Sequence, residues 1–126
     1  MVQDADLFAA VQTYFDGLYH CDPDRLNAVF HESSSLFDAE SGEVFAEPIA
    51  PFIRDVGLNE PNSPANLGQP PESEILLVDW LSPKCATVKI RIRAREKIYQ
   101  DHLGFVKGSD GWKIVSKIWF LERVVA

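Results

Sequence analysis

The sequence predicts an α+β fold in which three helices from the first half of the chain pack on one face of a curved, mainly antiparallel sheet. Three observations support this class. Apolar residues recur every three or four positions near the N-terminus, a proline-rich segment follows the last helical pattern, and strand-like apolar patterns occupy the remaining chain. Helices followed by consecutive strands are typical of an α+β domain with one apolar interior.

The composition is that of a globular protein. The chain has 126 residues, 46% of them hydrophobic, so we expect one domain over residues 1–126. Nineteen acidic and twelve basic side chains give a net charge of −7, which disfavours nucleic acid and anionic membranes as partners. No apolar run approaches the ~20 residues of a membrane span, and no secretory signal is evident. We therefore expect a cytoplasmic protein whose two cysteines are buried thiols.

The first helix is the clearest local prediction, with Asp4 or Asp6 as its N-cap. Its apolar side chains share one stripe: Leu7, Phe8, Val11, Tyr14, Phe15, Leu18 and Tyr19. Asp22 followed by Pro23 is a favourable start for a short second helix. Its apolar side predicts that it packs beside the first.

Two short strands separate the second helix from a third. Residues 33–38 and 43–45 flank a glycine-containing turn, which is typical of a hairpin. Pro48 begins the third helix, and Gly57 is expected to end it because glycine readily adopts the left-handed conformation. The prolines of residues 57–71 exclude regular structure. This segment is predicted to be a loop, either a lid over a cavity or a variable surface connection.

Four strands are predicted after this loop, at residues 74–81, 85–96, 98–107 and 112–123. Short turns join them, so they form an antiparallel meander with one face covered by the helices. One of these strands carries a basic stripe that faces solvent or a second subunit, or binds an anion. Its members are Lys89, Arg91, Arg93, Arg95 and Lys97.

Several motifs resemble the putative lumazine-binding subfamily of the nuclear-transport-factor-two-like superfamily. They are Tyr14-Phe15-Asp16-Gly17-Leu18, Cys21-Asp22-Pro23 with Leu26 and Phe30-His31, Tyr99-x-Asp101-x-Leu103, and the run from Asp110 to Lys117. The resemblance implies a cone-shaped, barrel-like fold with a curved sheet. The superfamily includes ketosteroid isomerase, limonene epoxide hydrolase, scytalone dehydratase and polyketide cyclases, besides members that only bind or associate. Resemblance therefore leaves the chemistry open.

Asp101 is the first candidate site residue. It shares a strand face with apolar side chains, so we expect it to face the helices. A buried carboxylate must be paired, hydrogen-bonded or neutral, and Tyr14 on the first helix would supply a hydroxyl. Tyr14, Asp101 and Asp38 are broadly analogous to the tyrosine and two aspartates of ketosteroid isomerase, although Asp38 equally fits a turn.

Further candidates carry alternatives. His31, at the end of the second helix, is either a helix cap or a general acid or base. Either face of the last strand could point inward, and a bulge that turned Lys117 inward would let it neutralise Asp101. The His-Cys-Asp run at 20–22 cannot converge on one ion, so neither a metal site nor a cofactor is predicted.

These observations favour a small-molecule-binding domain that forms a homodimer through the outer sheet face and holds an apolar or aromatic ligand. One alternative is a cofactor-free isomerase, dehydratase or cyclase that uses Asp101 and Tyr14 for proton transfer. Another is a pocketless dimeric interaction module. A pocket of about 300 Å³ or more that contains Asp101 would favour the first two hypotheses. The predicted ligand-binding residues are Tyr14, Phe30, Phe37, Phe52, Trp80, Asp101, Lys117 and Trp119, and the predicted catalytic residues are Asp101, Tyr14 and His31.

Overall fold

The computed structural model describes residues 4–125. Its helices are α1 (Asp4–Tyr19), α2 (Pro23–Val29) and α3 (Ile49–Leu58), with a short 3₁₀ helix, η1 (Glu60–Asn62). Its strands are β1 (Phe30–Asp38), β2 (Phe45–Pro48), β3 (Ser73–Ser82), β4 (Cys85–Ala94), β5 (Lys97–Gly108) and β6 (Gly111–Val124).

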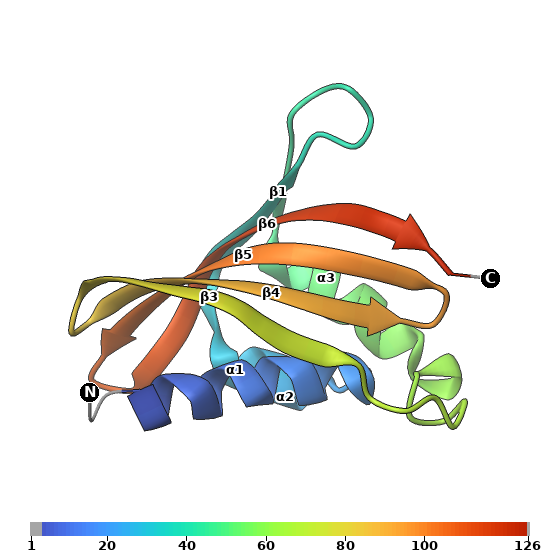
Figure 1. Ribbon diagram of the computed structural model, residues 1–126, viewed down its shortest axis with the longest axis horizontal. Coiled ribbons are helices and arrows are strands. Elements are labelled where there is room, and N and C mark those ends of the chain that lie inside the picture. The colour runs from blue at the N-terminus through green and yellow to red at the C-terminus, as the bar shows by residue number, and fades with distance from the viewer. Residues whose placement is uncertain (1–3, 126) are drawn as a thin grey trace.

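The six strands form one sheet in the order β2-β1-β6-β5-β4-β3. Strands β1 and β6 run parallel, and every other neighbouring pair is antiparallel. Figure 1 shows the sheet curving over the helices, which all lie on its concave face. The predicted α+β class and the four-stranded meander are therefore confirmed. Between residues 4 and 125, no helix is long and apolar enough to cross a bilayer.

Helix α1 carries most of the amphipathic stripe that its spacing predicted, but Phe8, which was assigned to this stripe, is exposed. Leu7, Val11 and Tyr14 are completely buried against the sheet. Burying one large apolar side chain contributes about 1.5–3 kcal/mol, so this stripe anchors the helix. Asp6 lies inside α1 and is not its N-cap, because the helix begins at Asp4; the side chain of Asp4 lies outside the described part of the structure.

Helix α2 packs tightly between α1 and α3. Asp22 caps it by accepting a hydrogen bond from the Asp24 N–H. A Cβ added to Gly57 would lie 2.6 Å from Pro23 Cγ, so α3 can approach α2 only because this side chain is absent. The prediction that Gly57 ends the third helix is wrong, since α3 continues to Leu58. Close packing, and not a left-handed turn, explains this glycine.

The hairpin is displaced from its predicted limits. Strand β1 already begins at Phe30, because the chain becomes extended directly after α2, so His31 lies in a strand and not at a helix end. Strand β2 begins only at Phe45, and residues 39–44 form a long connection that projects beyond the sheet in Figure 1. The predicted loop after α3 contains η1 in its first part.

Strand β6 has two irregularities that change which side chains face inward. Gly104 pairs with Ser116, whereas Phe105 pairs with Ile114, so Val115 is an extra residue in β6. Such a bulge shifts the alternation by one position. As a result, Trp112 is buried before the bulge and Lys117 is buried after it. A second shift, between Ile98 and Tyr99 of β5, leaves Glu122 as another extra residue.

Candidate functional site

A cavity of about 250 Å³ opens between the curved sheet and helix α3. Its volume is slightly below the ~300 Å³ lower limit expected for a drug-sized ligand site. Its walls are mainly apolar and come from α1, α3, β1, β2, β4, β5 and β6. Asp101 and Lys117 are its most buried charged lining residues and mark its interior end, whereas the exposed Phe45 and Asn59 mark its opening.

Tyr14, Asp101 and Lys117 form a buried polar cluster, which we call the inner trio. The Tyr14 hydroxyl donates a hydrogen bond to Asp101 Oδ2. Lys117 Nζ lies 3.8 Å from the same oxygen, which is beyond hydrogen-bond distance. Asp101 Oδ1 is buried without a hydrogen-bond partner among the described residues. The carboxylate is therefore held from one side only, and its position is set largely by Tyr14.

Two aromatic rings lie close to the Lys117 ammonium group. Nζ lies 4.3 Å from the centroid of the Phe52 ring and 5.5 Å from that of Tyr14. Only 8% of the Lys117 side chain is exposed. Cation–π contacts offset part of the cost of burying this charge.

Burial controls protonation in the inner trio. It raises the pKa of the Tyr14 phenol well above its usual value, and the Asp101 charge raises it further, so Tyr14 is a neutral hydrogen-bond donor. Burial also lowers the pKa of the Lys117 ammonium, and Asp101 opposes this shift. The desolvated amine therefore loses its proton more readily than a surface lysine does.

Five predicted site residues lie together at or behind the cavity. Asp101, Lys117, Phe52 and Trp119 line it, while Tyr14 lies behind Asp101. The conditional prediction for Lys117 matches the structure, because the bulge at Val115 turns it toward Asp101. Phe30 is one layer deeper. Its ring packs edge-on against both Tyr14, at 5.8 Å, and Phe52, at 6.4 Å.

The structure places three other predicted site residues away from the cavity. Phe37 is 37% exposed on the outer sheet face, because alternation in β1 gives the inward position to Leu36. Trp80 packs against Trp112 with ring centroids 5.8 Å apart. His31 is exposed in β1, and its Nδ1 accepts a hydrogen bond from the Ser33 N–H. None of the three lines the cavity.

Asp38 fits the turn alternative, and it also lies at the cavity wall. It lines the cavity, and its Oδ1 also accepts the Glu40 N–H across a turn. Arg95 was placed in the basic stripe, but it has a left-handed backbone at the β4–β5 turn (φ 58°) and lines the cavity instead. Sequence analysis also missed several smaller wall residues, which carry no polar signal: Leu18, Cys21, Leu36, Val56, Ile92 and Ala94.

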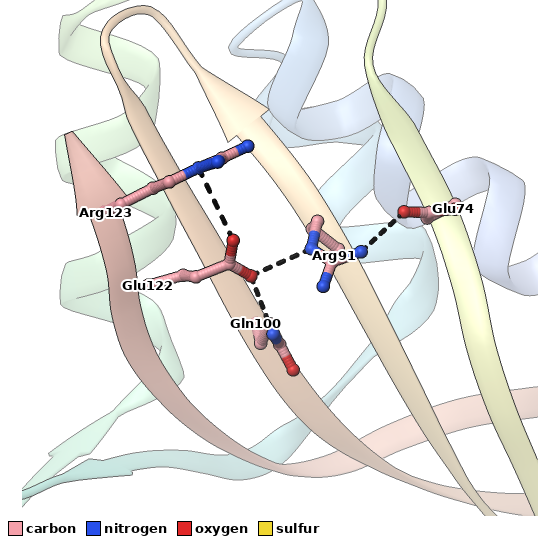
Figure 2. A network of polar contacts seen from close by, with 5 residues as sticks. All are labelled: Glu74, Arg91, Gln100, Glu122 and Arg123. Atoms are coloured by element: carbon pink, nitrogen blue, oxygen red, sulfur yellow. Dashed lines mark hydrogen bonds and ion pairs between the residues drawn. The ribbon is translucent and has the colours of Figure 1, made fainter. Parts of the chain in front are cut away.

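The outer face of the same sheet carries a very different charge cluster. Arg91 lies between Glu122 and Glu74 (Figure 2), and its nitrogens are 2.8 Å from a Glu122 oxygen and 2.7 Å from a Glu74 oxygen. Gln100 also donates a hydrogen bond to Glu122. We call these residues, with Arg123, the outer network. The hydrogen bond from Arg91 is the main cause that lowers the pKa of Glu122. Because the Arg91 guanidinium group is already paired with two carboxylates, the structure does not favour the anion-binding alternative for this part of the basic stripe.

Comparison with known structures shows the same fold at low identity. An NTF-2-like protein of unknown function from Silicibacter pomeroyi is 23% identical, with a TM-score of 0.79 and 94% of each chain covered. A ketosteroid isomerase-like protein from Erwinia carotovora atroseptica is 14% identical, with a TM-score of 0.64, 94% of this chain and 95% of that chain covered. A domain with a cystatin-like fold from Nostoc punctiforme is 12% identical, with a TM-score of 0.67 and coverages of 98% and 80%.

Sequence comparisons give the family. No curated protein sequence matches this chain significantly. A protein-family model described as "Putative lumazine-binding" matches residues 3–120, which is nearly the whole chain. The motif around Tyr14, the Tyr99-x-Asp101-x-Leu103 motif and most of the last strand all fall within this match. This chain therefore belongs to the putative lumazine-binding family, and it shares its fold with the NTF-2-like protein from Silicibacter pomeroyi.

Proposed function

We propose that the cavity binds a compact, largely apolar ring compound whose polar group meets Lys117. The observation that carries this proposal is the position of Lys117. A bulge turns this side chain into an apolar cavity, where it is nine-tenths buried and its nearest carboxylate oxygen is 3.8 Å away. A buried ammonium without a hydrogen-bonded partner is costly, so a ligand acceptor at this point would recover interaction energy.

The size and polarity of the cavity define the ligand class. A volume of about 250 Å³ suits one or two fused rings better than a long or branched compound. Trp119 and Phe52 supply aromatic walls, against which a ring can stack edge-on or offset. The family description names lumazine, a compound with fused rings, and lumazine therefore belongs among the compounds to be tested.

Proton transfer by Asp101 and Tyr14 is the second candidate. The Tyr14 hydroxyl already donates to Asp101, and Tyr14 does not line the cavity, so it would act by positioning the carboxylate. Asp101 alone would then exchange the proton with a bound compound. If the protein is a catalyst, Asp101→Asn should lose turnover, whereas a pure binding domain should keep its ligand in this variant. Unchanged turnover in Asp101→Asn would reject Asp101 as the acid or base.

A thermal-shift screen with aromatic, terpenoid and pteridine compounds tests the binding proposal. A compound at about 100 times its Kd stabilises the folded state by about 2.7 kcal/mol. Ala94 lines the cavity, so Ala94→Phe should fill the space and abolish the shift. Ala46→Phe is the matched control, because Ala46 is exposed between two lining residues of β2 and should leave the shift intact. Equal shifts in both variants would reject the cavity as the binding site.

We also propose that the chain forms a homodimer through the outer sheet face. Phe37 and Ile118 are neighbours on β1 and β6, and both are exposed, as is Phe120. Contiguous exposed apolar side chains of this kind are typical of an association surface. Light scattering should give a dimer mass for the wild type and a monomer mass for Ile118→Arg. Leu58→Arg, on the exposed part of α3, should stay dimeric; a monomeric wild type would contradict the proposal.

A further inference from the structure

We infer that Lys117 captures the carbonyl group of an aldehyde or ketone ligand as an imine. This inference rests on the proposed function, because the carbonyl compound must first enter the cavity. It adds a covalent, reversible step and restricts the ligand class to compounds that carry a reactive carbonyl next to an aromatic or other apolar ring.

The surroundings of Lys117 are those of a nucleophilic amine. The side chain is 8% exposed, and Nζ lies over the Phe52 ring at the interior end of the cavity. Other lysines are differently placed. Lys113 Nζ donates a 2.7 Å hydrogen bond to the Ala28 carbonyl oxygen, and Lys84 and Lys97 are exposed. Lysines that are desolvated in an apolar pocket are the ones that form imines with carbonyl compounds.

Asp101 supplies the second group that imine formation needs. Its Oδ2 lies 3.8 Å from Lys117 Nζ, close enough for a small movement to bring the two into hydrogen-bond contact. Transfer of one proton from the ammonium to the carboxylate converts an ion pair into a neutral amine and a neutral acid. A low-dielectric interior penalises the two charges, so this transfer is far less costly here than at the surface.

The chemical steps then balance. The neutral Lys117 nitrogen forms a bond to the carbonyl carbon, and the nitrogen proton moves to the former carbonyl oxygen, giving a carbinolamine. Protonated Asp101 donates its proton to this hydroxyl, the carbon–oxygen bond breaks, and one water leaves. The products are a protonated imine and the Asp101 carboxylate as its counter-ion. The hydrogen bond from Tyr14 stabilises that carboxylate, and no oxidant or reductant is consumed.

Reductive trapping tests this inference. The wild-type protein is incubated at neutral pH with naphthaldehyde and sodium cyanoborohydride, which reduces an imine to a stable amine, and the modified lysines are mapped by peptide mass spectrometry. We expect labelling of Lys117 to be about tenfold or more faster than labelling of Lys84 or Lys97. This comparison is made within one folded protein. Equal rates at Lys117 and the exposed lysines would overturn the inference.

Two variants sharpen the result. Lys117→Met keeps a similar side-chain volume and should remove the fast labelling while the slow surface labelling persists. Asp101→Asn keeps Lys117 but removes the proton donor, and it should slow labelling about a hundredfold. Unchanged labelling of Lys117 in Asp101→Asn would contradict the assigned proton transfer.

Naphthylmethanol, which has the same rings and no carbonyl group, separates this inference from the proposed function. If the alcohol binds in the cavity but the aldehyde is never trapped at Lys117, the proposed reversible binding is supported and the inferred imine formation is wrong. If neither compound binds, and nothing is trapped at Lys117, both proposals are wrong.

Discussion

The two faces of the sheet carry charge clusters on some of the same strands, and the two clusters are built in opposite ways. On the outer face, Glu122 accepts hydrogen bonds from both Arg91 and Gln100 (Figure 2), and its side chain is partly exposed. On the inner face, Asp101 has one hydrogen-bond donor, Tyr14, and a lysine at 3.8 Å, and one of its oxygens has no partner among the described residues. The outer network is satisfied without a ligand, whereas the inner trio has unused hydrogen-bonding capacity. This difference is the physical reason to place function inside the cavity.

The largest effect on stability is expected at Asp101. Asp101→Leu removes the carboxylate that lies 3.8 Å from the buried Lys117 ammonium, and it also removes the acceptor of the Tyr14 hydroxyl. Breaking a buried pair in this way costs about 3–5 kcal/mol. Urea unfolding of the variant and the wild type measures the loss. A cost no greater than that of Glu122→Gln would show that the two faces do not differ as described.

Tyr14→Phe removes one hydrogen bond to a charged group while keeping the aromatic packing, so we expect a loss of about 1.5–3 kcal/mol. The substitution should also change how the stability of the protein depends on pH in the alkaline range. The folded-state pKa of Tyr14 is raised above its usual value of 10.0, so its contribution is complete below pH 10.0 and is lost as pH rises through the folded-state pKa. Chemical unfolding followed across the alkaline range should show a larger loss in the wild type than in Tyr14→Phe, because the raised pKa values of Tyr99 and Cys21 contribute equally to both proteins.

A double-mutant cycle tests whether Asp101 and Lys117 act as a pair. Removing both charges with Asp101→Asn and Lys117→Met should cost less than the sum of the single changes, with a coupling energy of about 0.5–3 kcal/mol. Strict additivity in denaturant unfolding would mean that the 3.8 Å contact is not an energetic interaction.

The smallest effect is expected on the outer face. Glu122→Gln removes ion pairs that are open to solvent, and such pairs contribute little. Because hydrogen bonds from Arg91 and Gln100 lower the pKa of Glu122, its contribution is present above its usual pKa of 4.5 and is lost as pH falls through the folded-state value. Thermal melts should show a small difference at neutral pH that disappears in acid and at high salt. A difference in melting temperature between the wild type and Glu122→Gln that grew as the pH fell would contradict this predicted direction.

Much of this architecture could be predicted from the sequence, since helical spacing and strand alternation report directly on which side chains are buried. The contact between Tyr14 and Asp101 was expected for the same reason, because both lie on apolar faces. The inward turn of Lys117 could be stated only as one of two alternatives. It depends on the bulge at Val115, and a bulge is set by how two strands pair across the sheet, which one strand's pattern does not reveal.

The errors have similar causes. Phe37 was assigned to the cavity because it is aromatic, but the register of β1 gives that position to Leu36. Arg95 was assigned to the outer stripe, because nothing in the pattern indicates that β4 ends at Ala94 and that the backbone then turns left-handed. In both cases the strand register or the turn decides where the side chain lies, and the sequence pattern of a single strand does not reveal either.

The most direct test of the central claim uses the three tryptophans as reporters. Trp119 lines the cavity, whereas Trp80 and Trp112 pack against each other and do not line it. In a proton–nitrogen correlation spectrum each indole N–H gives one signal, so a titration with naphthylmethanol reports where the ligand lies. We predict that the Trp119 signal shifts progressively to saturation while those of Trp80 and Trp112 stay nearly fixed. A Trp119 signal that does not move while the ligand binds would contradict the assignment of the cavity as the binding site.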